Sequence, residues 1–297
     1  MWFKNLKLYR FTKPFTINTA ELNELLIRMP FHDCGAQEIQ SMGFVPLLKE
    51  SELLFHTNNA NVGFCLQIEQ RILPANVINT ELGAITDKIE LETGMPVSKK
   101  KQKELKEDVI QKLLPRAFTK TRQIRAIFLQ EAQVLAVDAG SDSQAETLLA
   151  CLRKCLESLP VVPFIDSAQN TLLTSWVMQE SPDSLQVLNE LELISTGDES
   201  AVIKVKNHDL QSDEVISHIK SGQLVEKIAI SFEGLFTGII NAGFDIKRIK
   251  YASELTDENQ DIPKDQKSAR LDADFVLFAN ALEQATNTLR SFTKELS

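Results

Sequence analysis

Hydrophobic and polar residues follow a helical period in the middle third of the chain. Apolar residues recur there on one side of a helical repeat, at Ile78, Leu82, Ile85 and Ile89. A single apolar stripe with this spacing predicts an amphipathic helix that follows Pro74 and is ended by Gly94 and Pro96.

A second helix is expected directly after the first. It runs from about Lys99 to Leu114, and Ser98 is a candidate N-cap. Leu105, Val109 and Leu113 form the expected inner side of this helix. The two helices together predict a helical hairpin over residues 75–114.

The rest of the chain predicts strands mixed with helices. Apolar runs bounded by turn residues predict strands over residues 2–12, 43–48, 52–58, 62–73, 123–129, 134–138, 224–232, 237–241 and 246–251, with a short extended segment at 159–164. Further helices are expected over residues 20–29, 143–157 and 273–294. The more polar stretch 164–223 is expected to be a small α+β insertion, with a helix beginning at Ser212. The fold class is therefore α+β.

Composition places the chain among ordinary globular proteins. Its 297 residues are 43% hydrophobic and 25% charged, which indicates one large domain or two to three smaller ones. The four cysteines, Cys34, Cys65, Cys151 and Cys155, include no CxxC pair, and no apolar run reaches the length of a membrane-spanning helix. We therefore expect a cytoplasmic protein without disulfides and without a membrane segment.

The charges are distributed unevenly. The chain as a whole carries a net charge of −9, yet ten basic and only three acidic residues lie between Lys99 and Arg125. The basic residues are Lys99, Lys100, Lys101, Lys103, Lys106, Lys112, Arg116, Lys120, Arg122 and Arg125. We interpret these ten as candidate contacts to phosphates, which makes any DNA binding independent of sequence. The alternative is an ordinary solvated helix face.

One aromatic residue lies among these basic residues. Phe118 has three interpretations: a core residue, an anchor in a protein interface, or a stacking contact to a nucleobase. Lys99, Lys103 and Lys106 share one face of the second predicted helix.

The sequence contains none of the common catalytic motifs. GxGxxG, GxxxxGK[ST], HExxH and GxSxG are all missing, and FHDCG, with His32 and Cys34, supplies at most two zinc ligands. We expect no enzymatic activity, no metal and no cofactor. An alternative is a Mg²⁺-dependent nuclease that uses the carboxylates of Glu254, Asp257, Glu258, Asp261, Asp265, Asp272 and Asp274. A solvated segment that caps the final helix, with Asp272 near its N-terminus, is simpler.

Several separated motifs resemble one known family. They are MWFKNLKLYRFT at the start, SMGFVPL at 41–47, ILP at 72–74, LLPRAF at 113–118, SLPVVP at 158–163, LTDENQDI at 255–262 and RLDADFVL at 270–277. In this order they resemble the recombination-associated protein RdgC family. The resemblance implies a nucleoid-associated homodimer that encircles duplex DNA as a ring and restrains RecA-promoted strand exchange.

The resemblance also implies an architecture. It consists of a central body with a two-lobed antiparallel sheet, built from residues 1–74, 115–163 and 224–297, a helical tip at 75–114 and a finger at 164–223. Phe118 becomes a candidate dimer contact. Asn207 and His208 fall at the second expected dimer contact, in a stretch that departs from the more basic, glutamine-containing one of some relatives.

A protein-interaction module that binds an acidic partner through the helical hairpin is the alternative from a different class. Retention on circular rather than linear duplex separates the two, because only a ring is held by a closed circle. Whether single strands are bound as well as duplex, and whether RecA is contacted directly, stays open from the sequence.

Overall fold

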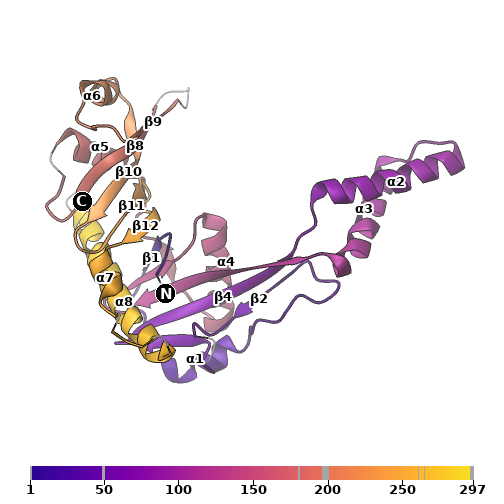
Figure 1. Cartoon of the computed structure of the whole chain (residues 1–297), viewed down its shortest axis with the longest axis horizontal. Coiled ribbons are helices and arrows are strands. Elements are labelled where there is room, and N and C mark those ends of the chain that lie inside the picture. The colour runs from indigo at the N-terminus through magenta and orange to yellow at the C-terminus, as the bar shows by residue number, and fades with distance from the viewer. Residues whose placement is uncertain are drawn as a thin grey trace. The chain divides into compact units, whose positions relative to one another are not determined.

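The computed structural model describes residues 2–48, 51–179, 181–195, 201–259, 261–263 and 265–294 (Figure 1). Over these residues the fold has eight α-helices and two antiparallel sheets, which confirms the α+β class. The helices are α1 (Thr19–Leu26), α2 (Ala75–Thr93), α3 (Lys99–Leu113), α4 (Asp142–Leu156), α5 (Asn170–Met178), α6 (Asp213–Lys220), α7 (Ser253–Asp257) and α8 (Lys267–Lys294). The strands are β1 (Lys7–Phe11), β2 (Gln40–Phe44), β3 (Phe55–Asn58), β4 (Asn61–Arg71), β5 (Thr119–Leu129), β6 (Val134–Val137), β7 (Val161–Pro163), β8 (Gln186–Ile194), β9 (Val202–Lys206), β10 (Leu224–Phe232), β11 (Phe236–Asn241) and β12 (Ile246–Tyr251).

The chain divides into two compact units. The body unit comprises residues 1–25, 46–65 and 124–297, and the hairpin unit comprises residues 26–45 and 66–123. The strands β4 and β5 each contribute residues to both units.

The first sheet has the order β2-β4-β5-β6-β1-β7, and β3 pairs with β4. Two tight turns set its register. Asn59 and Ala60, with φ of 48° and 64°, form the β3–β4 turn within the Asn-rich segment 58–61. The β5–β6 pair turns through Gln133 at φ 50°.

The second sheet belongs entirely to the body unit and has the order β12-β11-β10-β8-β9. One face of it enters the main hydrophobic core, where Ile228, Ile230 and Phe232 of β10 are fully or almost fully buried. The long helix α8 contributes Phe275 and Phe278 to the same core. The opposite face of this sheet carries charged side chains.

The helical hairpin is confirmed, and local chemistry explains its corner. Gly94 ends α2 in the left-handed region at φ 68°, and its N–H donates to Glu90 O over 2.8 Å. Ser98 caps α3, because its hydroxyl accepts from Lys101 N at 3.3 Å. A side-chain contact closes the connection, in which Val97 N donates to Glu90 Oε1 over 2.8 Å.

Several predicted boundaries are wrong for identifiable reasons. The strand expected over residues 43–48 is β2 at 40–44, because Pro46 stops pairing and Phe44 pairs with Leu66 of β4. Gly43 lies against backbone, since a Cβ there would be 2.3 Å from Phe31 N. The first helix ends at Leu26 instead of Met29.

The acidic C-terminal segment is also more ordered than expected. It contains the short helix α7, and α8 begins at Lys267 instead of residue 273. Asp272 therefore lies inside α8, away from its first turn, and its carboxylate Oδ1 is 2.9 Å from His56 Nε2. The expected N-terminal capping role of Asp272 is wrong.

Candidate nucleic-acid interface

The helix α3 carries lysines where helix electrostatics does not favour them. Lys99, Lys100 and Lys101 occupy its first turn, and that turn contains no acidic residue. The N-terminus of a helix carries partial positive charge, so cations there are unfavourable and anions are favourable. Together with the positive end of the helix dipole, the three lysines make this end of α3 attractive to phosphate, although Ser98 already accepts from Lys101 N.

The face of α3 that packs is distinct from the face that is charged. Val109 is buried and Leu105 is half-buried, and α3 packs against α2 in the hairpin. Lys99, Lys103 and Lys106 are exposed, as their spacing predicts. The helix can therefore present these ammonium groups without disturbing its packing.

Most of the expected contacts are exposed cations of the hairpin unit without an ion pair. Lys101 is the exception, because its Nζ lies 3.2 Å from Glu104 Oε2. The hairpin unit contains eight further predicted contacts, and in the described part of the chain no carboxylate forms a salt bridge with them. They are Lys99, Lys100, Lys103, Lys106, Lys112, Arg116, Lys120 and Arg122. Their charges are therefore available to an external anion.

The strand β5 extends the basic surface beyond the helix. Its first five residues, 119–123, are all exposed, whereas the strand is mostly buried from Ile124 onward. Lys120 and Arg122 are two residues apart and therefore lie on the same face of the strand. Three of the ten predicted contacts, Lys120, Arg122 and Arg125, lie on this strand, and the other seven lie on α3 or in the turn that follows it.

Arg125 differs from the other nine. It belongs to the body unit and is half-buried. Burial raises the pKa of the Cys65 thiol and the pKa of the Asp138 carboxyl. The positive charge of Arg125 acts in the opposite direction on both pKa values. Arg125 therefore already has partners in the fold.

The side chain of Phe118 is 86% exposed, so the core interpretation is wrong. The backbone on either side of the ring is fixed from the neighbouring strand. Arg71 Nη1 donates to Ala117 O at 3.0 Å, and Ile72 N donates to Phe118 O at 2.7 Å. A large apolar side chain held rigidly in solvent is typical of an interface anchor.

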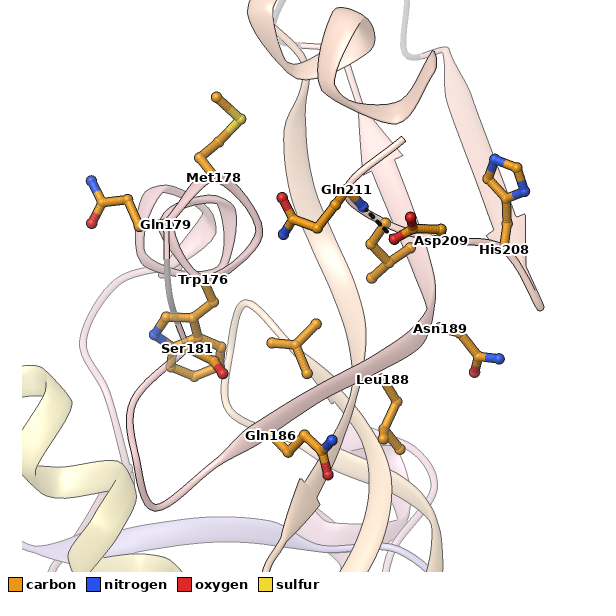
Figure 2. Close-up of a pocket in the computed structure, with 12 residues that line it drawn as sticks. Trp176, Met178, Gln179, Ser181, Gln186, Leu188, Asn189, His208, Asp209 and Gln211 are labelled. Carbon is orange, nitrogen blue, oxygen red and sulfur yellow. Dashed lines mark hydrogen bonds between the residues drawn. The ribbon is translucent and has the colours of Figure 1, made fainter. Parts of the chain in front are cut away.

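Asn207 and His208 lie in the turn that follows β9, in the body unit, and both are exposed. Asn207 adopts the left-handed region at φ 51°, and His208 Nε2 is 3.2 Å from Ser212 Oγ. His208 lines a cavity of about 1040 Å³ between α5, β8 and this turn. Figure 2 shows the amides of Asn189 and Gln211 at the same cavity.

A second basic surface was missed by the sequence analysis. It lies on the charged face of the second sheet and surrounds a cavity of about 330 Å³. The cations of this outer face are Lys204, Lys206, Lys227, Lys247 and Arg248, and its carboxylates are Glu190 and Glu192. Counting charges along the sequence could not find this surface, because its charged residues come from four strands. The only available signal was the alternation of apolar and basic residues in IKVK (203–206), which is typical of a strand with one charged face.

Ion pairs organise this outer face. Lys227 Nζ and Lys204 Nζ lie 2.7 Å and 3.4 Å from the two oxygens of Glu192. Arg248 Nη2 and Lys206 Nζ lie 2.6 Å and 3.8 Å from Glu190 Oε1. Because five cations share two carboxylates, the outer face keeps an excess of positive charge within an acidic protein.

The residues considered for metal binding have other contacts. Cys34 N donates to Glu69 Oε2 at 2.6 Å, and burial raises the pKa of the Cys34 thiol. Asp274 Oδ1 accepts from Asn259 Nδ2 at 3.0 Å. Across the described ranges no group of three or more His, Cys, Asp or Glu side chains is arranged to hold a metal ion.

The remaining cysteines on α4 pack in the core. Cys151 and Cys155 are 2% and 1% exposed, which confirms the interpretation of both as small hydrophobic residues. None of the described helices is long and apolar enough to cross a membrane.

Comparison with known proteins places the chain in a family. The family model described as "Putative exonuclease, RdgC" matches residues 1–295. The recombination-associated protein RdgC of Pseudoalteromonas atlantica is 39% identical over 280 residues, covering 94% of this chain and 93% of the relative. The recombination-associated protein RdgC of Shewanella oneidensis is 38% identical over 294 residues, covering 98% and 97%. The chain therefore belongs to the RdgC family, whose curated relatives are recombination-associated proteins.

Proposed function

We propose that this protein binds double-stranded DNA without sequence preference and acts as a homodimer in which two copies close a ring around the duplex. In this proposal the ring restrains RecA-promoted strand exchange by occupying the DNA. The protein is then associated with the nucleoid and needs no catalytic residue or cofactor.

One observation carries the proposal: the hairpin unit displays eight exposed cations that form no ion pair with any described residue, in a protein whose net charge is −9. Acidic surfaces elsewhere repel DNA, so binding is confined to the basic surfaces. These contacts reach phosphates, which are the same for every sequence. The outer face of the second sheet adds a separate set of cations for the same ligand.

The dimer contacts in the proposal are Phe118 in the hairpin unit and Asn207 with His208 in the body unit. Phe118 is the stronger candidate, because a fully solvated phenylalanine ring gains free energy when a partner covers it. We also propose the helical tip as residues 75–114 and the finger as residues 164–223, with the body formed by the remaining segments.

Charge reversal tests the phosphate contacts. The triple variant Lys99→Glu, Lys103→Glu and Lys106→Glu changes only exposed side chains of one face of α3. Lys154→Glu, on the exposed side of α4, controls for the effect of one lysine-to-glutamate change outside the hairpin unit. We expect the triple variant to bind duplex at least about tenfold more weakly and with a shallower salt dependence, while the control binds normally. Unchanged duplex affinity in the triple variant contradicts the proposal.

A second candidate function is a module that binds an acidic protein through the same hairpin. The exposed lysines on one face of α3 support this function as well as DNA binding. Because both complexes weaken with salt, the two functions are separated by whether DNA of closed topology is retained longer. Mg²⁺-dependent cleavage of DNA would instead support the nuclease alternative.

A further inference from the structure

A second large cavity of the body unit takes no part in the proposed DNA interface. It has a volume of about 660 Å³ and is lined by β1, the loop between β7 and α5, the start of α5 and the end of α8. This volume lies within the range of pockets that hold small ligands. Two arginines, Arg10 and Arg290, line it.

Arg290 is a half-buried cation at this cavity. Its Nη2 donates to Ala132 O at 2.7 Å, and its guanidinium carbon lies 5.8 Å from the centre of the Phe164 ring. Burial lowers the pKa of Arg290. Among the described residues no carboxylate forms a salt bridge with it. A partly desolvated charge of this kind is stabilised by any anion that enters the cavity.

Arg10 has a partner that is easily displaced. Its Nη2 lies 2.7 Å from Asp166 Oδ1, but the side chain of Asp166 is 82% exposed and that of Arg10 is 37% exposed. An exposed ion pair contributes little stability, so Asp166 can turn into solvent when a stronger anion arrives. Arg10 can then direct its planar guanidinium at that anion.

The hydroxyl groups around the two arginines complete a set of donors. Ser167 and Thr171 also line the cavity, whereas the hydroxyl of Thr293, at the same cavity, already donates to Arg290 O at 2.9 Å. Guanidinium groups bind phosphate oxygens in a bidentate manner, and hydroxyl groups supply the additional donors that a tetrahedral anion requires.

We propose that this cavity binds a phosphomonoester dianion between Arg10 and Arg290. Two cations match the two negative charges of a terminal phosphate, whereas a phosphodiester within a DNA strand carries one. The source is either a free nucleotide or the phosphorylated end of a nucleic acid strand. The site is separate from the basic residues of the hairpin unit and from the outer face of the second sheet.

Binding of short single strands tests the site. The probe is a twelve-nucleotide DNA labelled at its 3′ end, prepared with and without a 5′-phosphate, and its binding is followed by fluorescence anisotropy. We expect the phosphorylated strand to bind about tenfold more tightly, and adenosine monophosphate to compete. If adenosine monophosphate protects the protein against thermal unfolding while the two strands bind equally, the ligand is a free nucleotide. Equal binding of both strands without any effect of adenosine monophosphate overturns the proposal.

Three variants of the cavity test the proposal, because two should remove the preference for the 5′-phosphate and the third should strengthen it. Arg10→Gln and Arg290→Gln each remove one cation, and we expect each to abolish the preference for the 5′-phosphate. Asp166→Asn removes the competing carboxylate, and we expect it to strengthen that preference. Arg153→Gln, an exposed arginine of α4, is the matched control. Because Asp166 is exposed, its variant folds even if Arg290→Gln does not. If Asp166→Asn leaves the preference unchanged or weakens it, the proposal fails.

Closed circular duplex separates this site from the proposed function. Circles contain no terminal phosphate, so we expect the Arg10 and Arg290 variants to bind circles as tightly as the unmodified protein. If these variants bind closed circular duplex more weakly, the two arginines contact DNA along its length. That result contradicts a site for a terminal phosphate or a nucleotide. A glutamate peptide that competes as well as adenosine monophosphate shows carboxylate recognition and also overturns the assignment.

Discussion

Arg71 Nη1 donates a hydrogen bond of 3.0 Å to the carbonyl oxygen of Ala117, the residue immediately before the exposed ring of Phe118. The same guanidinium reaches across to the loop before β2, where Nη2 lies 3.2 Å from Cys34 O and 3.1 Å from Gly35 O. Three carbonyl groups from two segments therefore converge on one side chain. Arg71 fixes the direction in which the chain presents Phe118.

Removal of Arg71 tests this positioning role. In Arg71→Met we expect the hairpin unit to lose about 1.5–3 kcal/mol, because hydrogen bonds from a charged donor are lost and three carbonyl groups lose their partner. We also expect weaker self-association although Phe118 is intact. Chemical denaturation and sedimentation measure the two effects. Arg71→Lys keeps the charge without the planar fork, and full recovery of both properties by lysine would contradict the geometric explanation.

Because the ring of Phe118 is exposed, we expect its removal to weaken self-association without changing the stability of the monomer. Phe118→Ala removes a side chain that is 86% exposed, so the free energy of unfolding of the monomer should change by less than about 0.5 kcal/mol. The solution mass is expected to fall toward that of a monomer at concentrations where the unmodified protein is dimeric. Leu91→Ala is a control, because Leu91 is an equally solvated residue of α2, 88% exposed. A dimer that persists in Phe118→Ala removes Phe118 from the interface.

His56 makes stability depend on pH. Its Nε2 lies 2.9 Å from Asp272 Oδ1, and burial lowers the pKa of His56 although Asp272 opposes this effect. The folded state therefore holds the imidazole neutral where the unfolded chain already binds a proton. This contribution to stability is complete above the ordinary pKa of 6.5 and is lost as the pH falls through the folded pKa.

The measurement is the free energy of unfolding between about pH 7 and 5, where we expect stability to decrease as the pH falls. His56→Gln should remove that part of the decrease. Asp272→Asn should lower the pKa of His56 further, so the decrease still begins near the ordinary pKa of 6.5 but becomes larger and extends to lower pH. If His56→Gln retains the full pH dependence of the unmodified protein, another group is responsible.

Lys7 joins two carboxylates that are far apart in sequence. Its Nζ lies 2.6 Å from Asp142 Oδ1 and 2.5 Å from Asp245 Oδ2, and only 6% of the side chain is exposed. Burial alone would lower the pKa of Lys7, but the two hydrogen bonds raise it overall. The pKa of Asp142 is lowered, chiefly by its hydrogen bond to Lys7.

Lys7→Met should destabilise the body unit by about 1.5–3 kcal/mol, because Asp245 loses its charged partner in a partly buried place. The contribution of Lys7 is lost only as the pH rises above 10.5, and that of Asp142 only as the pH falls below 3.8. Asp245→Asn should cost more than Asp142→Asn, since the two side chains are 22% and 90% exposed. Equal costs in urea denaturation would show that burial of the pair is unimportant.

The outer face of the second sheet predicts a separate contribution to DNA affinity. Lys204→Glu and Lys247→Glu should each reduce duplex affinity to a similar degree on every sequence. Each lost phosphate contact reduces the slope of log affinity against log salt by about 0.9. Binding isotherms across a salt series measure this slope, with Lys154→Glu as control. A sequence-dependent loss would contradict phosphate contact.

Local patterns predicted the hairpin and its basic face well. The stripe from Ile78 to Ile89 and the N-cap Ser98 are local features, and local features determine both helices. Exposure of Lys99 and its neighbours followed from the same helical period. The family resemblance, based on separated motifs, is also confirmed.

The missed features depend on contacts between distant segments. The outer face brings Glu192, Lys204 and Lys227 together from three strands, and no count along the chain can reveal their proximity. Asp272 was expected to cap a helix, but its partner is His56, more than two hundred residues away. The backbone beside the exposed Phe118 is held by Arg71 and Ile72, which are more than forty residues away in sequence.

The most direct test of the proposed ring is retention on closed circular duplex. Protein is bound to circular DNA and to the same molecule made linear by one cut, then challenged with excess competitor while its solution mass is recorded. We expect a dimer that stays markedly longer on the circle, and a Phe118→Ala protein that leaves both forms at the same fast rate. Equal lifetimes of the unmodified protein on the circular and linear forms would contradict encirclement.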